Sequence, residues 1–135
     1  MKLNVSNIFT WLLRLLAAII MLQTLYFKFS GAEESVYIFT KLGMEPYGRI
    51  GIGVMELIAA VLILYPRTTG IGALLGMGLM SGAIFFHLTK LGFVVMDDGG
   101  QLFIYAALVF VSCFALVFLY RKSLLQLVNS LIKNH

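Results

Sequence analysis

Long apolar stretches separated by short polar segments dominate the chain. Four of them lie at about residues 8–28, 47–65, 70–88 and 102–120. Each is long enough to cross a bilayer, because a helix rises about 1.5 Å per residue and the hydrocarbon core is about 30 Å thick. The pattern predicts an all-α integral membrane protein. We expect one membrane domain over residues 1–135, with the four spans packed as a transmembrane bundle.

Two further segments have one apolar face. After the first span, Val36, Phe39 and Leu42 recur at helical spacing among charged residues, which predicts a short amphipathic helix on the membrane surface. Residues 121–135 form a basic amphipathic tail with apolar residues at the same kind of spacing. This tail either lies on the inner leaflet or extends the fourth span.

The composition agrees with a lipid environment. Hydrophobic residues make up 61% of the chain and charged residues only 12%, whereas soluble domains carry about 25% charged residues. The net charge of +4 comes from scattered basic residues, so no nucleic-acid partner is expected. The single cysteine, Cys113, cannot form an intrachain disulfide or a CxxC redox pair.

The charges between the spans predict the orientation. One side carries five basic residues and no acids: Lys2, Arg67, Arg121, Lys122 and Lys133. The other carries four basic and five acidic residues: Lys28, Lys41, Arg49, Lys90, Glu33, Glu34, Glu45, Asp97 and Asp98. Because Lys and Arg favour the cytoplasmic face of a membrane, both ends of the chain are predicted to be cytoplasmic.

Charges inside the hydrocarbon are costly, so they need a partner or a function. Arg14 and Lys28 share one face of the first span, and Gly53 and Glu56 share one face of the second. If these faces meet, Glu56 can pair with Arg14 or with Lys28, and the pattern leaves that choice open. The pair either pins two helices together or belongs to a site for a substrate, a proton or a quinone.

His87 lies near the end of the third span. It is either a hydrogen-bonded structural group or a proton carrier and hydrogen-bond donor to a ligand carbonyl. The only other histidine, His135, is at the end of the chain on the opposite side, so one chain offers no bis-histidine haem site. No metal site is predicted, because a zinc site would lack ligands.

The third span contains two GxxxG pairs, Gly72–Gly76 and Gly78–Gly82, on different faces. Such pairs let helices approach closely. We expect them, together with Gly53, to serve helix packing within the bundle. Self-association of the chain through the third span is the alternative.

Sparse motifs occur in a definite order along the chain. They are Trp11-Leu-Leu-Arg14, Phe27-Lys28-Phe29, the acidic surface helix, Arg49-Ile-Gly-Ile-Gly-Val-Met-Glu56, Leu64-Tyr-Pro66-Arg67 and Gly82-Ala-Ile-Phe-Phe-His87-Leu88. In order and spacing they resemble the DoxX and DoxX-like membrane proteins over about residues 8–121.

The resemblance implies a four-helix protein of the inner membrane, with Arg14, Lys28, Glu56 and His87 at the family's polar intramembrane positions. The family takes its name from a subunit of a thiosulfate:quinone oxidoreductase, and some relatives are placed with redox partners. Relatives with paired cysteines are suited to dithiol chemistry, which this chain lacks. The resemblance therefore favours an accessory or quinone-associated subunit of a membrane redox system.

The residues themselves identify no cofactor and no catalytic group, so whether the protein is an enzyme stays open. Quinone is the ligand that the resemblance suggests. A non-enzymatic scaffold or chaperone-like membrane protein is the main alternative. A permease for a small molecule or protons is a third, and would need an oligomer because four helices are few for a pathway.

Overall fold

The computed structural model describes residues 5–133, so Lys2 and His135 lie outside the described residues. The described residues form six α-helices and one short π-helical segment, with the following bounds: α1 Val5–Ser30, α2 Glu33–Lys41, α3 Tyr47–Leu64, α4 Thr69–Phe86, η1 His87–Leu91, α5 Gln101–Leu119 and α6 Arg121–Lys133. The all-α prediction is confirmed, and α2 is the short helix expected after the first span.

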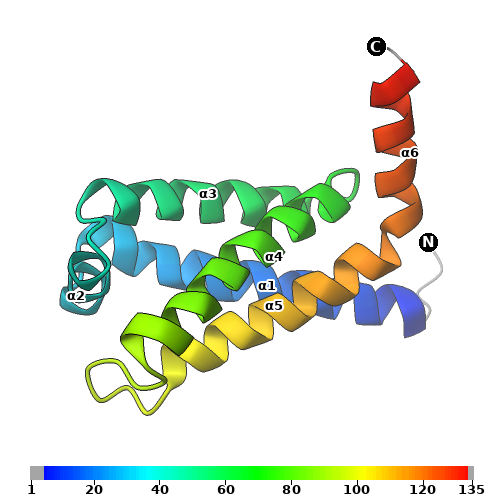
Figure 1. The fold of residues 1–135 in the computed structure, drawn as a ribbon. Helices are drawn as coiled ribbons and strands as arrows, with labels where there is room; N and C mark the ends of the chain where they lie inside the picture. Colours follow the sequence, from blue (N-terminus) through cyan, green and yellow to red (C-terminus); the bar gives the residue numbers. More distant parts are fainter. Residues whose placement is uncertain (1–4, 134–135) are drawn as a thin grey trace.

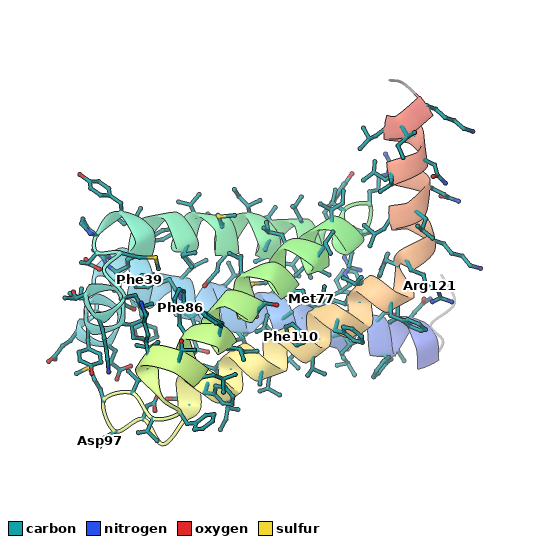
Figure 2. All side chains as sticks on the ribbon, viewed as in Figure 1. Phe39, Met77, Phe86, Asp97, Phe110 and Arg121 are labelled. Atoms are coloured by element: carbon teal, nitrogen blue, oxygen red, sulfur yellow. The ribbon has the colours of Figure 1, made fainter. Side chains whose placement is uncertain are left out.

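Four of the described helices are long and apolar enough to cross a membrane: Asn7–Ser30, Tyr47–Leu64, Thr69–Leu91 and Gln101–Leu119. Their outward surfaces are largely apolar, as Figure 2 shows along the whole bundle. Val111 is 63% exposed and Phe114 60% exposed. So much exposed apolar surface on one small chain would be unfavourable in water but is solvated by lipid. The helices can lie in lipid because each satisfies its own backbone hydrogen bonds.

The spans pack in the order α1, α3, α4, α5 and back to α1, so each helix contacts two neighbours. Figure 1 shows α1 beside α3 and α4 beside α5, with the second pair crossing the first obliquely. We call the end that holds α2 and the loop of residues 92–100 the α2 end. The end that holds the turn at Pro66, the start of α1 and α6 is the Pro66 end.

Small side chains bring the helices together towards the Pro66 end. Ala17, Ala59 and Ala73 are completely buried, and Cys113 and Leu116 of α5 fill the space between them. A Cβ atom added to Gly72 would lie 2.6 Å from the backbone nitrogen of Ile63 and 2.9 Å from the carbonyl oxygen of Ala59. The backbones of α3 and α4 are therefore in contact at this end.

Beyond this contact the two helices diverge towards the α2 end, where α2 lies across the opening (Figure 1). At the Pro66 end, Tyr120 breaks the helical path and α6 turns sharply away from α5 (Figure 1). The tail thus does not continue the fourth span. All its described side chains are at least partly exposed, and Leu124 contacts Gly70 of α4.

Candidate functional site

A cavity of about 690 Å³ lies at the α2 end, between the α1–α3 pair and the α4–α5 pair. All four spans, α2 and η1 contribute side chains to its wall. Most of these side chains are apolar, and the polar ones come from a few positions: Gln23, Thr24, Lys28, Glu33, Glu34, Ser35, Glu56, His87, Gln101 and Tyr105. Ligand pockets typically have volumes of about 300–1,000 Å³ and this kind of lining.

The charged pair in this cavity joins α1 to α3. Nζ of Lys28 lies 3.1 Å from Oε1 and 3.3 Å from Oε2 of Glu56, and the hydroxyl oxygen of Thr24 lies 3.1 Å from Oε2. Glu56 is only 3% exposed, and the side chain of Lys28 is 15% exposed. A carboxylate at this depth is stabilised by an opposite charge and by hydrogen bonds, and both are present.

The antiparallel register of α1 and α3 explains why the sequence left two partners open. Lys28 lies about two turns beyond Met21 along α1, and Arg14 about two turns before it. Met21 is near the level of Glu56, since the carbonyl of Lys28 accepts a hydrogen bond from Arg49 while Arg14 reaches Ile63. Along the axis of α1, the two cations are therefore at similar distances from Glu56, one towards each end of the helix.

Arg14 is held by the end of α3 instead. Its Nε donates to the carbonyl of Ile63 at 2.9 Å, and its Nη2 donates to the carbonyl of Leu64 at 2.6 Å. The guanidinium carbon lies 3.6 Å from the centroid of the Trp11 ring. The last carbonyls of a helix lack partners within the helix and carry partial negative charge, so a buried guanidinium is well placed there. Arg14 therefore lies outside the cavity.

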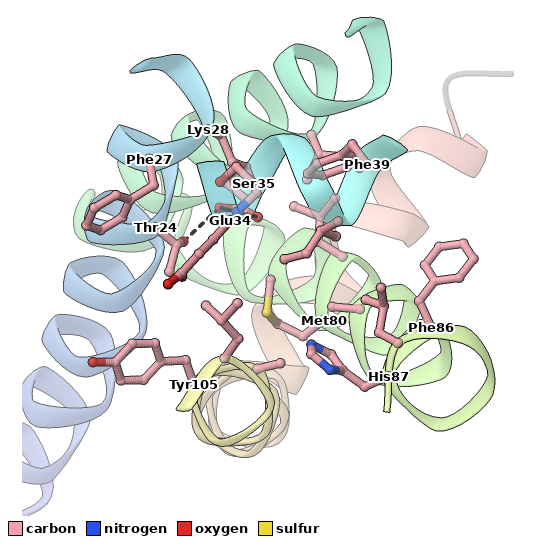
Figure 3. A pocket seen from close by; sticks show the side chains of 18 of the residues that line it. Thr24, Phe27, Lys28, Glu34, Ser35, Phe39, Met80, Phe86, His87 and Tyr105 are labelled. Carbon is pink, nitrogen blue, oxygen red and sulfur yellow. Dashed lines mark hydrogen bonds and ion pairs between the residues drawn. The ribbon is translucent and has the colours of Figure 1, made fainter. Parts of the chain in front are cut away.

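His87 is on the opposite side of the cavity from the ion pair. It begins the π-helical segment η1 and is 5% exposed. Its Nδ1 lies 2.9 Å from the carbonyl oxygen of Gly92, and its ring packs edge-on against Phe103 at 5.6 Å between centroids. Figure 3 shows His87 beside Met80, with Lys28 and Thr24 on the far wall. Three of the four predicted polar residues thus line one cavity.

The predicted packing glycines divide into two groups. Gly53 faces the ring of Phe29, and Gly72 and Gly76 face α3 and Cys113, each too closely for a Cβ atom without a shift. Gly78 and Gly82 have no atom within 4 Å of an added Cβ and line the cavity instead. The prediction of close packing within the bundle is therefore wrong for these two, because α3 and α4 have already diverged at their level. Self-association through α4 stays a prediction.

The chain matches the sequence profile of the DoxX-like family over residues 12–118. It belongs to the DoxX-like family. No curated protein and no solved structure is significantly similar to it. Family membership agrees with the resemblance noted in the motifs and with the four membrane spans, and it assigns no activity to the cavity.

Some residues of the DoxX-like cavity were not anticipated from the sequence. Thr24 lies one helical turn before Lys28 on α1, so the spacing between them could have indicated it. Gln101 and Tyr105 of α5 carried no such signal. The Nε2 of Gln101 donates to the Tyr105 hydroxyl at 2.8 Å, and both side chains line the cavity. Which face of α5 meets α1 depends on the tilt between helices, which a single sequence does not reveal.

The loop that follows His87 is organised by Asp98. Its Oδ1 accepts hydrogen bonds from the backbone nitrogens of Val95 at 3.0 Å and Gly100 at 2.8 Å, and its Oδ2 accepts from Leu102 at 3.2 Å. Partial burial acts to raise the pKa of this carboxyl group, but the three backbone donors, together with the electrostatic interaction with His87, outweigh it and lower the pKa below its ordinary value. Asp98 thereby binds the N–H of Leu102 in the first turn of α5 and anchors the loop beside the cavity.

Proposed function

We propose that this DoxX-like protein binds a lipophilic quinone-type molecule in the α2-end cavity and acts as a quinone-associated subunit of a membrane redox system. The observation that carries the proposal is the cavity itself. It combines an apolar lining with hydrogen-bonding groups on two facing walls, inside helices that cross the membrane. Such a lining suits a ring that has polar oxygens and an apolar tail.

The side chains present fit the polar oxygens of such a ring. The Lys28 ammonium has three protons, and its two contacts to Glu56 leave one to donate. His87 offers its second ring nitrogen from the facing wall. Apolar residues such as Met80 and Phe86 lie between or beside these groups (Figure 3). A bound quinone supplies two-electron redox chemistry, while the residues of this chain bind it, orient it and keep water away.

The proposal assigns the electron transfer to the ligand and to a partner protein. Among residues 5–133, no group of three or more His, Cys, Asp and Glu side chains is placed to hold a metal ion. The thiol of Cys113 is buried beside Gly76 and is not part of the cavity lining. Cofactors carry chemistry that side chains cannot supply, so a redox role requires such a ligand or partner.

The decisive experiment is purification from membranes in mild detergent, followed by organic extraction and quantification of quinones. A decyl-substituted benzoquinone is then added to the emptied protein, and the thermal unfolding midpoint is measured. We expect co-purified quinone and a concentration-dependent rise in the midpoint, because a ligand that binds only the folded state stabilises it. If no quinone is retained and the added compound leaves the midpoint unchanged, the proposal is wrong. A stable protein partner without any ligand favours the scaffold alternative.

We further propose that the protein lies in the inner membrane with both ends in the cytoplasm, so that the cavity is in the outer half of the bilayer. The support is charge: Arg67, Arg121, Lys122 and Lys133 are at the Pro66 end, and all acidic residues outside the spans are at the α2 end. Reporter fusions after Lys133 and within the Pro66 turn should read cytoplasmic. Fusions near Glu33 and Asp98 should read external, and the reverse pattern would invert the assignment.

A further inference from the structure

The hydrogen bond between His87 and Gly92 determines which ring nitrogen carries the proton. Nδ1 of His87 lies 2.9 Å from the carbonyl oxygen of Gly92. A carbonyl oxygen only accepts hydrogen bonds, so Nδ1 is the donor and bears the hydrogen. In the neutral ring, the other nitrogen, Nε2, then has a free lone pair and acts as an acceptor. This reverses the donor role that the sequence suggested for His87 towards a ligand carbonyl.

Nε2 has no partner within residues 5–133, although His87 is 95% buried, being 5% exposed. Every fully buried side-chain nitrogen or oxygen of the described residues has a hydrogen-bond partner. Because Nε2 has none, it cannot be fully buried, and a molecule in the cavity can reach it. The ring lines the cavity, as Figure 3 shows. An acceptor that is buried and lacks a protein partner costs free energy unless a molecule in the cavity donates to it.

The wall that faces His87 offers a hydrogen-bond donor. Both oxygens of Glu56 already receive contacts from Lys28, and Oε2 also receives the Thr24 hydroxyl. The ammonium of Lys28 has one proton left to offer there and can only donate, while Glu34 and Ser35 of α2 line the cavity beside it. The cavity therefore places the Nε2 acceptor of His87 on one wall and the Lys28 donor on the facing wall.

From this arrangement, and resting on the proposed function, we propose that His87 makes the site selective for a ring compound bearing a hydroxyl group, so that the reduced quinol binds in preference to the quinone. The quinol hydroxyl donates to Nε2 of His87, and the oxygen at the other end of the ring accepts from Lys28. A quinone carbonyl has no hydrogen to donate and would face the lone pair of Nε2 without a bond.

Two substitutions separate the ligand contact from the loop contact. In His87→Asn the side-chain amide nitrogen can take the place of Nδ1 and keep the bond to Gly92, while nothing replaces Nε2. In His87→Gln the longer side chain can bring its amide oxygen near the position of Nε2, while the bond to Gly92 is lost. The first variant tests ligand selectivity, and the second tests the structural role of the loop.

Binding of three probes is measured anaerobically on the detergent-purified protein: a decyl-substituted benzoquinol, the corresponding quinone and the bis-O-methyl ether of the quinol. We expect the wild type to bind the quinol about three- to tenfold more tightly than the other two, the range for one neutral hydrogen bond. His87→Asn should bind all three equally, with the affinity for the ether unchanged. His87→Gln should retain part of the preference while unfolding at a lower temperature.

The outcomes distinguish this inference from the proposed function. Equal binding of quinol, quinone and ether by the wild type would overturn the selectivity while leaving a quinone-type site in place. A quinol preference that persists in His87→Asn would show that another residue provides the acceptor, and would overturn the assignment to His87. Failure of all three probes to bind would overturn the proposed function and this inference together. The comparison of ligands on the wild type decides the point even if a variant does not fold.

Discussion

Lys28 and Glu56 lie on neighbouring helices of the same cavity wall, with Nζ of the lysine 3.1 Å from Oε1 of the glutamate. Lys28 is near the end of α1, whereas Glu56 is in the middle of α3. The long lysine side chain thus extends back along α1 to reach the carboxylate. Long basic side chains can place their charge away from their own Cα atom, and here this brings the cation to the cavity.

Removing one member of this pair should lower the free energy of unfolding more than removing both members. Lys28→Leu or Glu56→Leu alone should lower the free energy of unfolding by about 3 kcal/mol, because the remaining charge is left without its partner at a buried position. The double variant Lys28→Leu/Glu56→Leu should recover part of the loss. Thermal unfolding in detergent gives the four values of the cycle.

The matched control for this cycle is Arg14→Leu combined with Glu56→Leu. Arg14 binds the carbonyls of Ile63 and Leu64 and makes no contact with Glu56, so the two losses should add. Coupling between Arg14 and Glu56, with additive losses for Lys28 and Glu56, would contradict the pairing seen in the structure.

Arg14 should not tolerate replacement by lysine. A lysine has the charge but lacks the planar guanidinium that reaches two carbonyls and stacks on Trp11. Arg14→Lys should therefore lower the free energy of unfolding by about 2 kcal/mol, the range for hydrogen bonds to charged groups. Arg67→Lys, at an exposed position in the Pro66 turn, should change it by less than about 0.5 kcal/mol. Equal effects of the two substitutions would argue against the buried role of Arg14.

Gly82 should tolerate a side chain only at the expense of the space for a ligand in the cavity. A Cβ atom added there meets no atom within 4 Å, so a longer side chain has room to extend into the cavity. Gly82→Leu should weaken binding of the decyl-substituted benzoquinone by about tenfold, the scale of overfilling a packed site. The protein should stay folded, because leucine also favours the helix.

Gly51→Leu is the control for Gly82→Leu. Gly51 is also in a spanning helix and also has open space around an added Cβ, but it does not line the cavity. Its substitution should leave quinone binding unchanged. An equal loss of binding in both variants would mean that the effect comes from the bilayer-facing surface or from general destabilisation.

Asp98 should make the loop of residues 92–100 sensitive to acid. Its pKa is lower in the folded protein than in the unfolded chain, because its backbone hydrogen bonds outweigh the effect of burial. A depressed carboxyl pKa stabilises the folded state above the unfolded pKa of about 3.9, and this contribution is lost as the pH falls through the lower folded value. Asp98→Asn should therefore be less stable than the wild type near neutral pH, by about 1 kcal/mol, because the amide has no charge and no second oxygen to accept from Leu102.

The difference between wild type and Asp98→Asn should shrink as the pH is lowered below about 4, since Asp98 then becomes protonated first in the unfolded chain and, at a lower pH, in the folded protein. Thermal unfolding across this pH range measures it. Asp97→Asn serves as the control, because Asp97 is in the same turn, is exposed and makes no side-chain hydrogen bond within the described residues. A constant difference at all pH values would show that Asp98 stabilises the loop without its charge.

The sequence by itself determined the class of the fold. Four apolar stretches of bilayer length can only be helices in lipid, because every backbone polar group there must be bonded within its own segment. The same reasoning made Arg14, Glu56 and His87 conspicuous, since polar groups in such stretches are costly. Periodicity also indicated that Lys28 and Glu56 lie on faces that can meet. These conclusions depend on composition and local geometry, which the chain carries residue by residue.

Only the tertiary structure decided how these residues are grouped. Two cations lie at similar heights from Glu56, and the carbonyls at the end of α3 bind one of them, so Lys28 is left for the carboxylate. Gly72 and Gly78 are alike in sequence, but α3 and α4 touch at the first and have diverged at the second. The tilt between the helices creates the cavity. The hydrogen bond from His87 to Gly92 leaves the acceptor nitrogen of His87 facing it. Helical periodicity specifies which face a residue occupies, whereas the distance between two faces is set by the packing of the whole bundle.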